Sequence, residues 1–383
     1  MRVLCYAQHL TGVGHFVRMA AIARGLAAAG HDVLLVDGGR PVPRAGEGVP
    51  RLVLPALHRG PHGLAAVEGP LAAALDERGR RLASAVAELR PDVVLIDHYP
   101  FSKWELEEEI LAMIAAARRV TPRVLVLCSL RDIAPKTAHE RPTGGRSYEA
   151  EVRARLAATF DGVLVHADPA FTRFEEHFAA AEDLPVPVHY TGFVVNDAPS
   201  DGGAPAAPPY AVLSCGGGVR GLPFLLATMR AFERAAAAGI AGALELRVYP
   251  GLFAAVEEDA TLRAAATSVV QVMRFTPDFD RVLRASALSI SRAGYNTTVQ
   301  LLQAGIPAVV VPDPRMSDQP PRARRLAARG LAAVVEGDPP DEAALVTAIG
   351  EARARPRAAH GFDLGGVAGT RALVERLQSK RAR

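Results

Sequence analysis

Short apolar runs alternate with longer stretches of helical spacing along the chain. This alternation predicts parallel β-sheets joined by crossover helices, because a strand that is buried on both faces reads as a continuous apolar run. The first series of expected strands is Val3–Ala7, Val33–Val36, Val93–Ile96, Arg123–Cys128, Gly162–His166 and Val188–Tyr190. The second series is Ala211–Cys215, Glu245–Tyr249, Val269–Val272, Leu288–Ser291, Ala308–Val311 and Ala332–Val335.

A segment without apolar periodicity separates the two series. Residues 196–209 are rich in Pro, Gly and Ala, a composition typical of a linker. We therefore expect an N-terminal domain over 1–195, the linker, a second domain over 210–365 and a C-terminal helix over 366–383. The predicted fold class is α/β, with two Rossmann-like, doubly wound domains that face one another across a cleft.

Composition narrows the function classes. The 44 basic and 41 acidic residues leave a formal charge of +3, which gives no strong field for nucleic acid or for an anionic membrane. The three cysteines, Cys5, Cys128 and Cys215, show no metal-ligand spacing, as expected in a reduced compartment. No apolar run approaches the roughly 18 residues of a transmembrane helix. We expect a cytoplasmic protein without a membrane segment, and a homodimer stays open.

The loop after the first expected strand carries the first candidate chemistry. Gly12 and Gly14 allow a tight turn and leave backbone amides at a helix start, where His15 follows. A histidine there is suited to proton transfer near neutral pH, so His15 is the expected catalytic base. Other acceptor-side candidates, as alternative bases or orienting partners, are Asp97, His98 and Asp132.

Two loops of the second expected domain suit phosphate groups. Ser214 and Gly216–Gly218 follow its first strand, and Gly294 with hydroxyl and amide side chains follows the strand that ends at Ser291. Both loops precede helices, whose positive N-terminal ends favour a diphosphate. Arg292 could stabilise the same leaving group, and no cluster of His, Asp or Glu shows convincing metal spacing.

Several segments together resemble the donor domain of GT-B glycosyltransferases. The C-terminal ones are Ser291–Gln300, Gly305–Ala308, Pro312, Gln319 and Arg322–Leu331, similar to family 28, typified by the N-acetylglucosaminyltransferase of peptidoglycan synthesis. The chain resembles a bacterial group of predicted glycosyltransferases more closely still. The segments that carry this resemblance are Asp97–Phe101, Ser129–Ile133, His166–Pro169, Arg274–Phe279 and Ala293–Thr297.

The resemblance implies an inverting transfer from a nucleoside-diphosphate sugar, usually a UDP-sugar, without a catalytic metal or other cofactor. The acceptor hydroxyl would belong to a small molecule or natural product. The nucleotide base of the donor would lie beside Phe275 and Thr276. Gln300 would bind the ribose, and Gln319 would contact the sugar that is transferred. The full set of expected donor-binding residues is Ser214, Gly216, Gly217, Gly218, Phe275, Thr276, Arg292, Gly294, Tyr295, Asn296, Thr297, Thr298, Gln300, Asp318 and Gln319.

Two departures and three alternatives qualify this interpretation. The ribose position is usually acidic, whereas Gln300 is neutral, and Pro320 replaces a second amide side chain beside Gln319. A nucleotide-sugar hydrolase on the same scaffold stays open, because a loop like Gly12–Arg18 activates water in a related family. An NAD-dependent dehydrogenase stays open with Asp37 at a strand end, although Val17 breaks its glycine pattern. A non-catalytic nucleotide-sugar binding protein is the third alternative.

Overall fold

The computed structural model describes residues 1–60, 62–134, 145–195, 209–217 and 221–382. The chain divides into two units, Met1–Asn196 with Phe362–Arg383, and Asp197–Gly361. The expected linker lies outside the described residues except for Pro209. The second unit ends at Gly361 rather than at residue 365, and the C-terminal helix belongs to the first unit.

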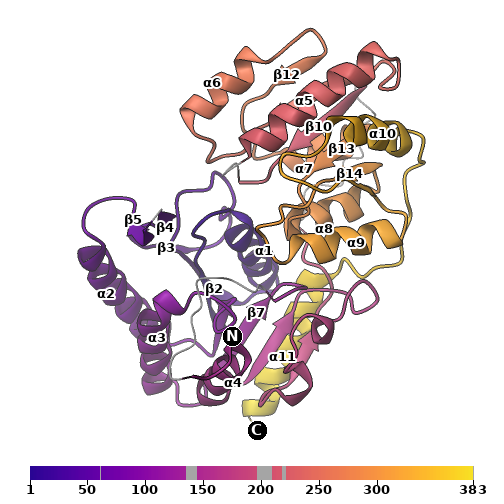
Figure 1. The fold of residues 1–383 in the computed structure, drawn as a ribbon. Helices are drawn as coiled ribbons and strands as arrows, with labels where there is room; N and C mark the ends of the chain where they lie inside the picture. Colours follow the sequence, from indigo (N-terminus) through magenta and orange to yellow (C-terminus); the bar gives the residue numbers. More distant parts are fainter. Residues whose placement is uncertain (61, 135–144, 196–208, 218–220, 383) are drawn as a thin grey trace. The chain divides into compact units, whose positions relative to one another are not determined.

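The first unit is built on a parallel sheet of seven strands in the order β3-β2-β1-β6-β7-β8-β9 (Figure 1). An antiparallel ribbon, β4-β5, accompanies the sheet. The strands are β1 Arg2–Ala7, β2 Asp32–Asp37, β3 Arg51–Val53, β4 Leu57–Gly60, β5 Gly63–Ala66, β6 Val93–Asp97, β7 Leu125–Leu130, β8 Gly162–Val165 and β9 Val188–Tyr190. The helices are α1 Gly14–Ala28, α2 Leu71–Leu89, α3 Glu107–Val120, α4 Tyr148–Thr159 and α11 Gly366–Ala382, with 3-10 turns η1 Trp104–Leu106, η2 Phe174–Glu176 and η3 Ala181–Asp183.

The second unit holds a parallel sheet of six strands in the order β12-β11-β10-β13-β14-β15. Its strands are β10 Tyr210–Ser214, β11 Glu245–Tyr249, β12 Val270–Val272, β13 Leu288–Ser291, β14 Ala308–Val310 and β15 Ala333–Val334. Its helices are α5 Leu222–Ala237, α6 Val256–Ala264, α7 Phe279–Ala285, α8 Tyr295–Ala304, α9 Gln319–Ala328 and α10 Glu342–Arg353. Both sheets therefore confirm the predicted α/β, doubly wound class.

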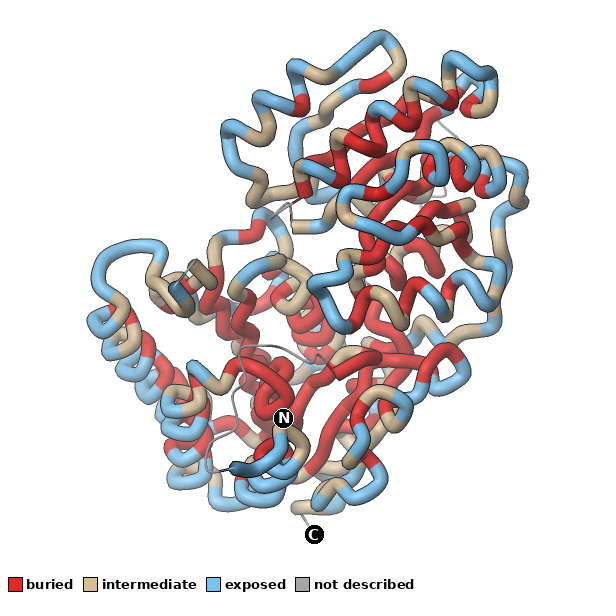
Figure 2. Tube along the Cα trace, viewed as in Figure 1, coloured by how far each residue is buried: buried red, intermediate tan, exposed pale blue. Residues whose placement is uncertain are grey.

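Burial explains why the apolar runs form these strands. Every residue of β6 and β7 is buried, as a parallel strand covered by helices on both faces requires. Figure 2 shows the central strands of both sheets buried, whereas the helices leave one face exposed. In α2 the buried positions Ala74, Arg78, Leu82 and Ala85 recur at helical spacing. The unexpected strands β3 to β5 are short and largely unburied, so their sequences show no continuous apolar run.

Close packing through glycines attaches α11 to the first unit. A Cβ at Gly369 would lie 2.2 Å from the main-chain oxygen of Thr191, and one at Gly25 of α1 would lie 2.1 Å from a methyl group of Val367. Only glycine permits these approaches. Among the described residues, no helix combines the length and the apolar character that a membrane span needs.

Candidate functional site

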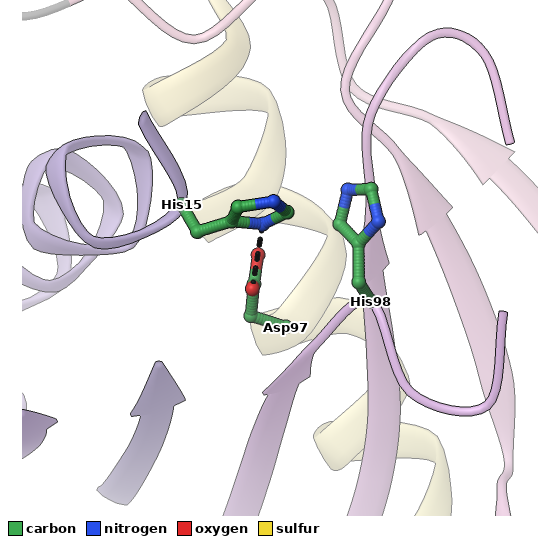
Figure 3. A group of neighbouring side chains, drawn as sticks. All are labelled: His15, Asp97 and His98. Atoms are coloured by element: carbon green, nitrogen blue, oxygen red, sulfur yellow. Dashed lines mark ion pairs between the residues drawn. The ribbon is translucent and has the colours of Figure 1, made fainter. Parts of the chain in front are cut away.

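The first unit brings His15 and Asp97 together at the point where its strand order changes direction. Strands β1 and β6 are parallel neighbours in the sheet, so the loop after β1 and the carboxyl end of β6 lie at the same edge. His15 is the second residue of α1, and Asp97 is the last residue of β6. Nδ1 of His15 lies 2.9 Å from Oδ2 of Asp97 (Figure 3). The Asp97 side chain has no exposed surface, whereas the His15 side chain is 22% exposed.

Two cations also contact Asp97. Arg18, one turn after His15 on α1, donates from Nη2 to Oδ1 of Asp97 at 2.5 Å. Lys103 donates from Nζ to Oδ2 and, at 3.0 Å, to the main-chain oxygen of Asp97. Burial by itself would raise the pKa of Asp97, but the charge of His15 when it is protonated and the charges of Lys103 and Arg18 outweigh burial and hold that pKa well below its ordinary value. Asp97 is therefore a carboxylate.

His15 is prepared to accept a proton. Burial and the positive charges of Arg131 and Lys103 lower the pKa of His15 well below its ordinary value, against the opposing effect of Asp97. The resting imidazole is consequently neutral. Nδ1 lies 2.9 Å from the Asp97 carboxylate without hydrogen-bond geometry. Because a carboxylate only accepts hydrogen bonds, a small rotation of the ring would favour the proton on Nδ1 and leave the lone pair on Nε2. This is the tautomer that a general base needs.

His98 lies beside this pair, directly after β6. Its ring meets the His15 ring edge to face, with centroids 4.5 Å apart, and its backbone adopts a left-handed φ of 63° (Figure 3). Burial lowers the pKa of His98 well below its ordinary value, and a protonated His15 would lower it further. Nε2 of His98 is buried and has no partner among the described residues.

The ligand atoms of His15, Asp97 and His98 all lie within 4.8 Å of one another, a spacing that a metal ion would allow. The carboxylate is however already paired with Arg18 and Lys103, which an ion would have to displace. The trio therefore suits proton transfer better than metal ligation.

The other acceptor-side candidates lie close to this edge of the sheet. Gly12 and Gly14 form the turn that leads into α1. Asp132 is fully buried two residues after β7, the neighbour of β6, and its Oδ1 accepts a hydrogen bond of 2.9 Å from the amide of Ile133. That bond commits part of Asp132 to shaping its own loop.

The second unit places two candidate loops at its own change of strand direction. Ser214 and Ser291 end the neighbouring strands β10 and β13 and are register partners. Gly216, with a φ of 72°, and Gly217 follow β10, whereas Gly218 lies outside the described residues. Gly294 is the N-cap of α8 and offers no side chain, so the first amides of the helix have no side-chain cap. These backbone groups suit the oxygens of a diphosphate.

Gln300 has an acidic partner that the sequence did not reveal. Its Nε2 donates to Oδ1 of Asp280, in the first turn of α7, at 2.5 Å. Burial raises the pKa of Asp280, while the bond from Gln300 and the charge of Arg284 oppose that rise. An acidic side chain thus lies beside the neutral Gln300. The nearby Phe275 is exposed before α7, and Thr276 caps the turn by accepting from the amide of Asp278 at 3.2 Å.

Gln319 joins the loops that follow β13 and β14. Its Oε1 accepts hydrogen bonds from the amides of Ala293, at 3.2 Å, and Asp313, at 2.9 Å. Asp318 receives Nη2 of the buried Arg322 at 2.9 Å, and Nη1 of Arg322 donates to the main-chain oxygen of Ala293 at 2.6 Å. Asp318 therefore stabilises the loop at Ala293 indirectly, through Arg322. The carbonyl oxygen of Gln319 is held by two backbone amides, which leaves its amide nitrogen outside these two bonds.

Comparison with known proteins identifies this region. Residues 247–360 match the model of the glycosyltransferase family 28 C-terminal domain. This match lies within the second unit. A sequence comparison with curated proteins finds no match.

Solved structures extend the likeness to both units. The glycotransferase of kitacinnamycin is similar at a TM-score of 0.63 and 18% identity, over 98% of each chain. The calicheamicin glycosyltransferase CalG4 gives 0.58 and 17%, over 100% of this chain and 94% of its own. MurG of Acinetobacter baumannii gives 0.52 and 19%, over 98% and 99%. The chain therefore has the GT-B fold, as the sequence predicted.

Three expected donor residues within the matched segment are paired or buried inside the second unit. Arg292 donates to Oδ1 of Asp338 at 2.5 Å and lies over the ring of Phe224, so its charge is committed to the unit's own packing rather than available to a diphosphate. Tyr295 and Thr298 are each 1% exposed and face the core. Helical periodicity explains the pattern, since Asn296 and Thr297 on the other side of α8 stay partly exposed.

Proposed function

We propose that this protein is an inverting, metal-independent glycosyltransferase that moves a sugar from a nucleoside-diphosphate sugar to a hydroxyl group of a small molecule or natural product. The observation that carries the proposal is the His15–Asp97 pair, in a chain whose residues 247–360 match the family 28 C-terminal domain. The first unit would supply the base and the second unit the donor site.

The mechanism follows from the chemistry of the pair. Nε2 of His15 takes the proton from the acceptor hydroxyl while its oxygen attacks the anomeric carbon. The bond from that carbon to the diphosphate oxygen breaks, and a single displacement inverts the anomeric configuration. The imidazolium that forms is stabilised by Asp97 at 2.9 Å. General-base assistance of this kind contributes about 10²–10⁴-fold to a rate.

The donor is assigned to the loops of the second unit. The uncapped amides at Gly294 and the start of α8, with the loop at Gly216 and Gly217, would hold the diphosphate. Gln300 and Asp280 would receive the ribose hydroxyls, and the amide nitrogen of Gln319 a sugar hydroxyl. We propose UDP as the nucleotide. The similar glycosyltransferase VinC was solved in complex with dTDP, which makes dTDP the second nucleotide to test.

Product analysis tests the proposal. The protein is incubated with UDP-sugars and dTDP-sugars and a panel of hydroxylated acceptors, and nucleotide release and glycoside mass are measured together. We expect a glycoside and stoichiometric nucleoside diphosphate, and both at a rate lower by about 10²–10⁴-fold with His15→Ala. Free sugar at the same rate with and without acceptor would instead favour the hydrolase, in which His15 activates water.

A further inference from the structure

Lys103 is an unusual residue for this chain. Of the 44 lysine and arginine residues only three are lysine: Lys103, Lys136 and Lys380. Lys103 is 5% exposed, and Lys380 lies in the last turn of α11. One of the few lysines of the chain is therefore buried in the candidate site. Its charge is carried by a compact ammonium group.

The geometry shows what this ammonium group does. Nζ of Lys103 contacts Oδ2 of Asp97, the same oxygen that lies 2.9 Å from Nδ1 of His15. Arg18 takes the other oxygen, Oδ1. Lys103 and His15 therefore share a single oxygen of the only carboxylate in the trio.

The backbone around Lys103 is held in an unfavourable conformation. Lys103 has a φ of 69° and His98 a φ of 63°, so left-handed residues stand at both ends of the turn that follows β6. Side-chain-bearing residues adopt this region only where their surroundings enforce it. Main-chain bonds enforce it here, from Ser102 to the oxygen of His98 at 3.1 Å and from Leu106 to that of Lys103 at 3.0 Å.

We propose that Lys103 is a positioning residue for His15: it fixes Oδ2 of Asp97 and limits how much of the carboxylate charge reaches the imidazole. The inference rests on the proposed function for the role of His15 as base. Removing Lys103 would leave Asp97 with one cation instead of two and give His15 more of its charge.

The charges around His15 set the sign of the expected effect. The titratable and charged groups around His15 are Asp97, His98, Lys103 and Arg131, with Arg18 on the other oxygen of Asp97. Burial lowers the pKa of His15 most, and the positive charges of Arg131 and Lys103 lower it further, against the opposing effect of Asp97. Loss of one cation must therefore raise that pKa. Burial also lowers the pKa of Lys103 itself, a response that arginine could not show.

Histidine NMR reads this effect without any substrate. The His15 signal is assigned by its loss in His15→Gln, and the imidazole is titrated in the parent, Lys103→Met, Lys103→Arg and the exposed control Lys380→Met. We expect the His15 pKa to rise by about 1 to 2 in Lys103→Met, the scale of one nearby charge in a partly buried site. It should stay near the parental value in Lys103→Arg, which keeps the charge, and in Lys380→Met.

An unchanged His15 pKa in folded Lys103→Met would overturn the inference. An equal rise of that pKa in Lys103→Arg would also overturn it, because the effect would then come from packing rather than from charge. If Lys103→Met does not fold, the parent alone decides: a His15 that titrates at or above its ordinary pKa of about 6.5 contradicts the proposal. The titration also separates the two claims. The expected shift in a protein without transferase activity upholds this inference and rejects the proposed function, and activity without the shift does the reverse.

Discussion

The two units use the same position in the same kind of sheet in opposite ways. In each sheet the order in which the chain adds strands reverses at one pair of neighbours. This pair is β1 and β6 in the first unit and β10 and β13 in the second. The first unit fills that point with buried ionised groups that pair with one another around Asp97. The second leaves glycines and uncapped amides there and directs Arg292 to Asp338.

The difference reflects the task of each point. A base needs a fixed electrostatic environment before the substrate arrives, so its charges are paired within the protein. A diphosphate brings its own charge, and backbone amides at a helix start can receive it without an unpaired cation in the free protein. The first site is therefore expected to respond to loss of charge, and the second to loss of individual hydrogen bonds.

Replacement of His15, the proposed catalytic base, is the strongest test of this difference between the two units. His15→Ala should lower turnover by about 10²–10⁴-fold and leave nucleotide binding nearly unchanged, because the proposed nucleotide contacts all belong to the second unit. Steady-state kinetics and calorimetric titration with UDP measure the two effects. The exposed His62→Ala is the matched control. If His15→Ala loses nucleotide affinity instead, its loop is a phosphate site and the dehydrogenase alternative gains support.

Neutralising the shared carboxylate should cost stability. Asp97→Asn leaves Arg18 and Lys103 buried without a counter-charge, which typically lowers the free energy of unfolding by about 3–5 kcal/mol. Urea unfolding followed by the fluorescence of Trp104, the single tryptophan, reports on the first unit. Asp92→Asn is the control, since its partner Arg2 is partly exposed and such pairs contribute about 0–1 kcal/mol. Equal losses in both variants would show that the charges at Asp97 are not as tightly coupled as their distances indicate.

Substitutions at the proposed donor site should have smaller effects, and those at Gln300 and Asp280 should be coupled to each other. Gln300→Ala should weaken UDP binding by up to about tenfold, the worth of one hydrogen bond, with little change in turnover at saturation. Asp280→Asn should act in the same direction, and the double variant should lose less than the sum because the two side chains are bonded to each other. Strictly additive losses would mean that the two residues contact the nucleotide independently or not at all.

Removal of divalent ions should have the smallest effect. Turnover in a chelator should equal turnover with added Mg²⁺, because helix ends rather than a carboxylate-bound ion are proposed to hold the diphosphate. Initial rates under the two conditions make the measurement. Complete loss in the chelator with recovery on addition of a divalent ion would contradict metal independence and would direct attention to His15, Asp97 and His98.

Long apolar runs carried enough information to predict most of both sheets, because a parallel strand such as β6 is buried on every side. The short strands β3 to β5 carry no such signal. Residues placed by a glycine turn or a helix start, such as His15, were predictable from local sequence. Lys103 and Asp280 were not singled out, because their partners become visible only when separate elements pack. The direction of Arg292 likewise depends on the distant Asp338.

The return of the chain through α11 has a consequence for biosynthesis. The sheet of the first unit emerges from the ribosome early, but the helix that packs on it through Gly369 is made only after Asp197–Gly361. At ordinary elongation rates this delay is on the order of ten seconds. The second unit is contiguous in sequence, so all its parts are present as soon as it is synthesised, whereas the first unit lacks α11 until the second has been made. The second unit can therefore complete its fold before the first.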